Sequence, residues 1–181
     1  MMGIRNLEEF LNEKKQSEET QLNWEQKRTE WLQAVELFYA QIQVLLKPLK
    51  EKGLLSIEFK KTDVREEYIG EYETQQMTIL FADQKVTFSP IGTNIIAAFG
   101  RIDMHGPDGE VKFLWVDKES EGPKITVTVS DGSTQKKEPQ VKQPVPPEDR
   151  AWKIATPPPH IRFIELNEDS FSDVLLGVIH G

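Results

Sequence analysis

Large apolar side chains recur at helical spacing between Asn23 and Lys52. One series repeats every seven residues and a second follows it four residues later: Trp24, Trp31, Phe38 and Leu45, then Val35, Ile42 and Leu49. This spacing predicts a long amphipathic helix with one apolar face. Asn23 has the position of an N-cap, and Gly53 supplies a C-terminal stop. At a rise of about 1.5 Å per residue the helix would be roughly 45 Å long, which is longer than a small domain needs.

A shorter helix is expected to precede it, from Leu7 to about Glu18. Asn6 and Glu9 have the spacing of a capping box. The apolar residues of this segment all lie near its start: Leu7, Phe10 and Leu11. Residues 12–21 are entirely polar, so the second half of this helix would be solvated or covered by another molecule. The two helices would form an N-terminal helical hairpin.

The apolar period changes to two after Leu54, which is typical of strands with one buried face. Strands are expected near residues 55–59, 68–72, 77–81, 86–88, 94–104, 111–116, 125–129, 152–154 and 161–164, with connections at 62–67, 83–84, 89–92 and 106–109. The segments 68–72 and 77–81 are either two short strands or parts of one long strand. We assign the strand from Asn94 to Met104 to the centre of the sheet, because residues 95–99 are consecutively apolar. Gly100 indicates a bulge or a close backbone approach.

The order of elements predicts an α+β fold. It would comprise the helical hairpin, a mainly antiparallel, meandering sheet of six or more strands, and a C-terminal helix capped by Asn167. One face of that helix would hold Phe171, Val174, Leu175 and Val178. We expect the long helix to cover one face of the central strand, and the final helix or a curl of the sheet to cover the other. A sheet curled into a barrel is an alternative.

The chain reads as a single domain, 1–181. Within it we distinguish a helical N-terminal region (1–53), an antiparallel sheet (54–130), a loop rich in Pro, Lys and Gln (131–149), and a final part with strands and a helix (150–181). The loop has no large apolar residue beyond Val141 and Val145. We therefore expect it to be flexible.

Composition narrows the classes of function. The chain has no cysteine, which excludes disulfides, thiolate metal sites and cysteine nucleophiles. Its acidic net charge of −8 argues against general affinity for nucleic acid. No apolar run approaches the roughly 20 residues that cross a bilayer, and the N-terminus lacks the apolar region of a signal peptide. We expect a cytoplasmic protein that binds no membrane.

Candidate chemistry is sparse. Asp103, His105 and Asp108 lie near one hairpin turn and could ligate a divalent metal, although a turn histidine at the surface is the alternative. The sequence contains no serine elbow, P-loop or dinucleotide fingerprint. No catalytic residue and no cofactor can be assigned, and enzymatic activity is disfavoured.

The leading hypothesis is a soluble, non-enzymatic protein-interaction module, such as an acidic inhibitor, an immunity-type protein or a subunit of a complex. Its partner, another protein or a second copy, would bind the N-terminal helices at Leu7, Phe10, Leu11, Trp24 and Trp31. The first alternative is a small-ligand-binding α+β barrel whose pocket is lined by Phe99, Phe113 and Trp115. The second is an enzyme that uses carboxylates or a metal near Asp103 and His105.

Overall fold

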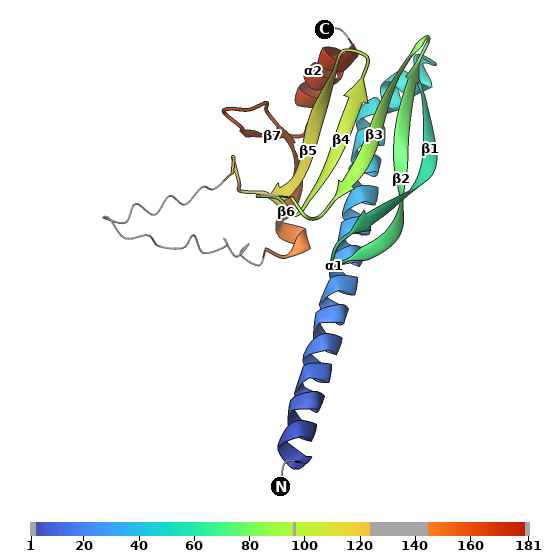
Figure 1. The fold of residues 1–181 in the computed structure, drawn as a ribbon. Coiled ribbons are helices and arrows are strands. Elements are labelled where there is room, and N and C mark those ends of the chain that lie inside the picture. The colour runs from blue at the N-terminus through green and yellow to red at the C-terminus, as the bar shows by residue number, and fades with distance from the viewer. Residues whose placement is uncertain (1–2, 96, 124–144, 180–181) are drawn as a thin grey trace, which may run out of the picture.

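The computed structural model describes residues 3–95, 97–123 and 145–179, except the side chains of residues 20–22. A long N-terminal helix precedes an open antiparallel sheet, and a second helix follows it (Figure 1). The helices are α1 (Gly3–Glu51) and α2 (Glu168–Ile179), and a short 3-10 helix, η1 (Pro147–Asp149), precedes β6. The strands are β1 (Ser56–Glu66), β2 (Gly70–Phe81), β3 (Gln84–Gly92), β4 (Gly100–Gly106), β5 (Gly109–Asp117), β6 (Arg150–Ala155) and β7 (Phe163–Glu165). The predicted α+β class is confirmed.

The first helix corrects the predicted hairpin of two helices. α1 is continuous over 49 residues and passes through Asn23 without a break. Between Gly3 and Pro48 it contains no glycine or proline, and residues 12–21 are mostly Glu, Gln and Lys, which have high helix propensity. An asparagine with capping-box spacing can begin a helix, but it does not stop one that is already running.

The C-terminus of α1 follows the sequence more closely. Gly53 adopts a φ of 71°, its N–H donates to Lys50 O, and the N–H of Leu54 donates to Leu49 O. These two bonds form a Schellman motif, in which a glycine at positive φ satisfies the last helical carbonyls. Pro48 lies inside the last turn without ending the helix there.

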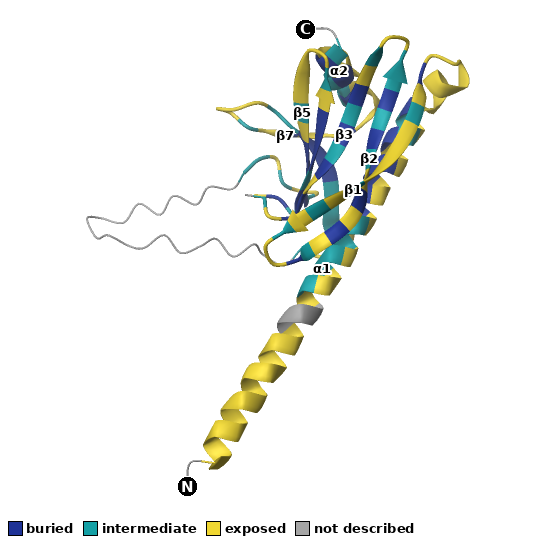
Figure 2. Ribbon diagram, turned by 45° about the vertical axis from the view of Figure 1, so that its right-hand side comes forward, coloured by how far each residue is buried: buried dark blue, intermediate teal, exposed yellow. Residues whose placement is uncertain are grey.

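Only the C-terminal half of α1 packs on the sheet (Figure 2). Of the predicted apolar stripe, Trp31, Val35, Phe38 and Ile42 are buried, Trp24 and Leu45 are half-buried, and Leu49 is exposed. Phe38 lies at the centre of this packing, with its ring 4.9 Å from that of Trp152 and 5.0 Å from that of Phe113. The predicted amphipathic helix is therefore present, but its buried face begins only at Trp31.

Among the described residues the sheet has seven strands, paired in the order of the chain from β1 to β7. Three local predictions were wrong. Residues 62–67 mostly continue β1, and residues 89–92 belong to β3, where the register shifts between Pro90 and Gly92. The apolar run at residues 95–99 precedes β4, which begins only at Gly100. β4 is nevertheless the middle strand of the seven.

Both helices lie on the same face of the sheet, which corrects the expectation of cover from opposite faces. Phe171 of α2 packs against Phe88 and Phe113, the same two rings that contact Phe38 of α1. The hairpin between β4 and β5 contacts the end of α2, where the N–H of Asp108 donates to Val178 O over 2.8 Å. On the other face a small cluster of Ala98, Leu114, Val116 and Phe163 is buried.

The alternative of a closed barrel is also wrong, since β1 and β7 form the two edges of an open sheet. A strand predicted at residues 125–129 lies outside the described residues, as does most of the predicted loop at 131–149. The last residues of the predicted loop form η1, which leads into β6.

Candidate functional site

The N-terminal part of α1 projects away from the rest of the molecule (Figure 2). Every residue from 3 to 19 is exposed. Four of them are large, apolar and more than half exposed: Ile4, Leu7, Phe10 and Leu11. We call residues 3–19 the arm. Ile4, Leu7 and Leu11 have the spacing of one helix face, so the arm presents a short apolar stripe to solvent.

The structure separates the five residues predicted to bind a partner. Leu7, Phe10 and Leu11 lie on the arm. Trp24 is half-buried and stacks on Tyr68, with ring centroids 5.2 Å apart. Trp31 is fully buried, and its Nε1 donates to the hydroxyl of Tyr72 over 2.9 Å. Trp31 therefore belongs to the core, and the accessible candidates are those of the arm.

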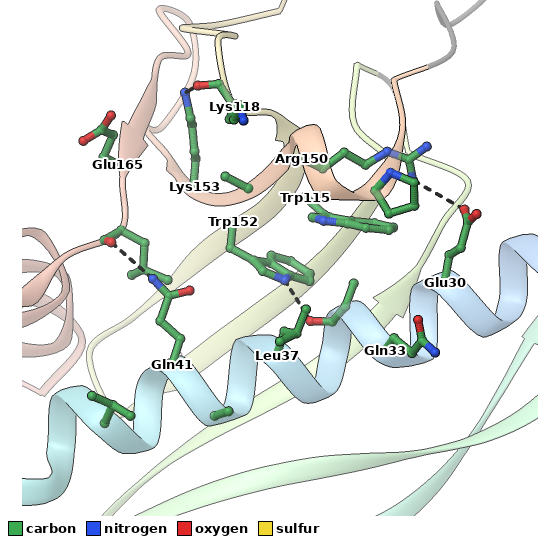
Figure 3. A pocket seen from close by; sticks show the side chains of 16 residues that line it. Glu30, Gln33, Leu37, Gln41, Trp115, Lys118, Arg150, Trp152, Lys153 and Glu165 are labelled. Atoms are coloured by element: carbon green, nitrogen blue, oxygen red, sulfur yellow. Dashed lines mark hydrogen bonds and ion pairs between the residues drawn. The ribbon is translucent and has the colours of Figure 1, made fainter.

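A groove of about 630 Å³ runs between the outer side of α1 and strands β5, β6 and β7 (Figure 3). On the helix it is lined by Leu37 and Val44, which are 68% and 70% exposed, with Ala40 between them. Trp152 lies deeper, and its Nε1 donates to Ala34 O over 2.9 Å. The helical wall of this groove is thus a second apolar stripe that no described residue covers. The sequence analysis missed it because it followed only the heptad pattern of the core face.

Three cations line the opposite wall, and each has partners within the chain. The Lys153 amine donates to Lys118 O and Ser120 O at 2.8 and 2.7 Å. The Arg150 guanidinium lies 3.9 Å from the ring centroid of Phe99 and donates through Nε to Val145 O. Burial lowers the pKa of Arg150, and Glu30, 3.8 Å from its Nη1, opposes that effect. Lys118 lies 3.3 Å from Asp149.

Two of the three predicted metal ligands, Asp103 and His105, lie close together in the structure, and the third does not join them. Possible ligand atoms of Asp103, His105 and Glu110 lie within 4.8 Å of one another. Asp108 is in the turn and is not part of this group. Glu110 replaces it because β4 and β5 pair with His105 opposite Glu110, a register that the two-residue turn after Gly106 would have predicted.

The buried member of that group already has a cation beside it. Asp103 is 4% exposed, and Arg101 Nε lies 2.8 Å from its Oδ1, with Nη2 donating to Oδ2 over 3.2 Å. Burial raises the pKa of the Asp103 carboxyl, while Arg101 opposes that rise. A metal ion would have to displace Arg101, so the arrangement favours a structural ion pair.

The three aromatic residues proposed for a ligand pocket do not share one. Phe113 is fully buried beneath α1 and α2. Trp115 lines the groove, and Phe99 lies under the guanidinium of Arg150. The groove was missed because its walls come from segments more than 70 residues apart in the sequence.

No protein-family model matches the chain, and comparison with curated proteins and with solved structures gave no match. None of the helices in the described part of the chain combines the length and the hydrophobicity that a bilayer span requires.

Proposed function

We propose that this protein is a non-enzymatic protein-interaction module whose recognition element is the arm at residues 3–19. The observation that carries the proposal is the exposed stripe of Ile4, Leu7 and Leu11 on a helix that continues without interruption into the core. A free helix of this kind matches the helix-in-groove mode of recognition, in which residues spaced by three, four and seven contact an apolar surface.

The energetics favour an arm that is used in binding. An isolated helix of this length is marginal in water, and the arm makes no contact with the sheet that would stabilise it. Fully burying one large apolar side chain contributes roughly 1.5–3 kcal/mol before ordering costs. Because the arm is already helical and continuous with α1, a partner would not have to bear the full entropy of folding it.

The test compares the full-length protein with a double variant, Leu7→Glu with Leu11→Glu. Leu176→Glu is the matched control, because Leu7 and Leu176 are both 57% exposed and both lie on helices. Tagged proteins are used to capture untagged copies and cellular proteins, and each captured protein is then purified and titrated calorimetrically. We expect binding to be retained by the control and lost by the arm variant. Equal binding by all three proteins would exclude the arm as the recognition element.

Removal of residues 2–20 provides the stability control. Since every described residue from 3 to 19 is exposed, the truncated chain should melt within a few degrees of the full-length protein. A truncated chain that fails to fold would show that the arm contributes to the core.

A further inference from the structure

We infer that the partner of the arm is a second copy of this chain. In the resulting dimer the two α1 helices lie antiparallel, and the arm of each copy occupies the groove beside α1 of the other. This inference rests on the proposed function, and it adds the identity of the partner and the surface that receives the arm.

The two apolar stripes have the same length and the same spacing. Ile4 and Leu11 are seven positions apart on the arm, with Leu7 between them, and Leu37 and Val44 are seven positions apart on the wall of the groove, with Ala40 between them. Each stripe is about 10.5 Å long at the helical rise of 1.5 Å per residue. The small Ala40 at the centre of the second stripe leaves room for a leucine from the first.

The two stripes face similar but not identical directions around α1. Leu7 and Ala40 are 33 residues apart, which is about nine turns at 3.67 residues per turn. In a straight helix of 3.6 residues per turn, the two stripes would be offset by only about 60°. A gentle right-handed wrap of the two α1 helices, which corresponds to 3.67 residues per turn, would remove this offset in the dimer.

A single two-fold axis satisfies all of these contacts. If Ile4 lies opposite Val44 of the other copy, the antiparallel register also places Leu11 opposite Leu37, and Leu7 beside Ala40. The axis then passes near residue 24, and both arms are seated by the same operation. This is the property of an isologous interface, in which the same surface is used by both subunits.

The arm is acidic, and the groove is close to neutral once the partners of its cations are counted. The arm carries five glutamates and three basic residues, a net charge of −2. The charged side chains that line the groove are Lys118, Arg150 and Lys153 with Glu30 and Glu165, a net charge of +1. Lys118 is already paired with Asp149, and Arg150 with Glu30, so the groove offers an apolar surface with little net charge. Such a surface suits the apolar face of an amphipathic helix better than a small polar ligand.

Sedimentation equilibrium over a range of concentrations tests the inference. We expect the full-length protein to form a dimer, twice the 20.8 kDa mass of one chain. Leu11→Glu on the arm and Leu37→Glu in the groove should each raise the dissociation constant by at least about tenfold, and Leu176→Glu should not. A protein that stays monomeric up to about 100 µM, or a Leu37→Glu variant that dimerises like the wild type, would overturn the inference.

Mixing the two variants distinguishes arm-in-groove from arm-on-arm pairing. Leu11→Glu retains an intact groove and Leu37→Glu retains an intact arm, so the mixture should form a heterodimer with one complete contact. An arm-on-arm dimer would gain nothing from mixing, and that result would reject the groove as the receiving surface.

Cross-linking fixes the register, because the chain has no native cysteine. Ile4→Cys combined with Val44→Cys should form an intermolecular disulfide on mild oxidation, and Ile4→Cys combined with Leu176→Cys should not form that pair. If the protein is monomeric but the arm variants lose a different captured protein, the second-copy inference fails and the proposed function stands. If the arm variants change neither self-association nor capture, both fail.

Discussion

The indole ring of Trp31 lies directly against the α-carbon of Gly100, at the first residue of β4. A Cβ built on Gly100 would overlap three atoms of the six-membered ring of Trp31. Trp31 is fully buried, and its ring also packs 5.8 Å from that of Trp152. Gly100 is therefore required by the close approach of α1 to the sheet, which is one of the two roles that the sequence indicated for it.

Gly100→Ala should destabilise the protein by about 1–3 kcal/mol, because the added methyl group must displace a fully buried ring. Urea unfolding measures the effect. Gly177→Ala is the matched control: Gly177 lies in α2 with no atom near its Cβ position, so alanine there should stabilise the helix by about 0.5–1 kcal/mol. An equal effect of both substitutions would mean that the ring of Trp31 moves freely.

Tyr72→Phe should cost about 1–3 kcal/mol of unfolding free energy. The Tyr72 hydroxyl accepts from Trp31 Nε1 and donates to Glu66 Oε2 over 2.7 Å, so its removal leaves a buried indole N–H without a partner. Burial raises the pKa of Tyr72 and Glu66 raises it further, in agreement with a protonated, donating hydroxyl. Tyr68→Phe should change stability by less than about 0.5 kcal/mol, since Tyr68 is mostly exposed.

The hydrogen bonds that join Trp31, Tyr72 and Glu66 continue to Thr93, in the loop before β4. Glu66 Oε1 accepts from both the N–H and the hydroxyl of Thr93, at 2.7 and 2.8 Å. Hydrogen exchange at Thr93 should therefore accelerate in Tyr72→Phe. Unchanged exchange there would show that Glu66 holds the loop independently of Tyr72.

Arg101→Met should destabilise the protein more at pH 7 than at pH 4. Because burial raises the folded-state pKa of Asp103, the folded protein binds a proton at this carboxyl more tightly than the unfolded chain does. The resulting stabilisation is fully present below the unfolded pKa, about 3.9, and is lost as pH rises through the folded pKa. Removing Arg101 raises that pKa further, because the principal opposing cation is gone. We expect a loss of about 1–3 kcal/mol at pH 7 and a smaller loss at pH 4.

Urea unfolding at the two pH values measures the difference, and Arg101→Lys should recover part of it. Lys61→Met is the surface control, because Lys61 and Glu73 form an exposed pair that contributes little at either pH. A loss for Arg101→Met that is independent of pH would assign the effect to packing of the arginine stem.

Phe38→Ala should cost about 3–5 kcal/mol, because Phe38 is fully buried among the rings of α1 and the sheet. Its neighbour Leu37 is mostly exposed, so Leu37→Ala should cost less than about 0.5 kcal/mol in a dilute sample, where dimerisation is negligible. A concentration-dependent effect of Leu37→Ala would reveal the dimer interface.

The sequence by itself determined the elements whose signals are local. The spacing from Trp31 to Ile42 identified the buried face of the long helix, Gly53 identified its end, and Asn167 identified the start of α2. The side chain of Asn167 accepts a hydrogen bond from the N–H of Ser170 over 2.9 Å. Gly106–Gly109 marked a hairpin that the structure confirms. These features depend on helical period, backbone conformation and capping, all of which are set within a few residues.

Only the tertiary structure decided which surfaces are covered. Residues 95–99 have the composition of a buried strand, yet β4 begins after them. The side of the sheet that α2 occupies depends on contacts between Phe171 and rings far away in the sequence. The groove was also beyond local reasoning, because Leu37 and Val44 resemble core residues in a helical pattern. The sequence did single out Leu7, Phe10 and Leu11 as a surface for a partner, but it placed them on a separate short helix. Burial is a property of what lies opposite a side chain, and among the described residues nothing covers these two stripes.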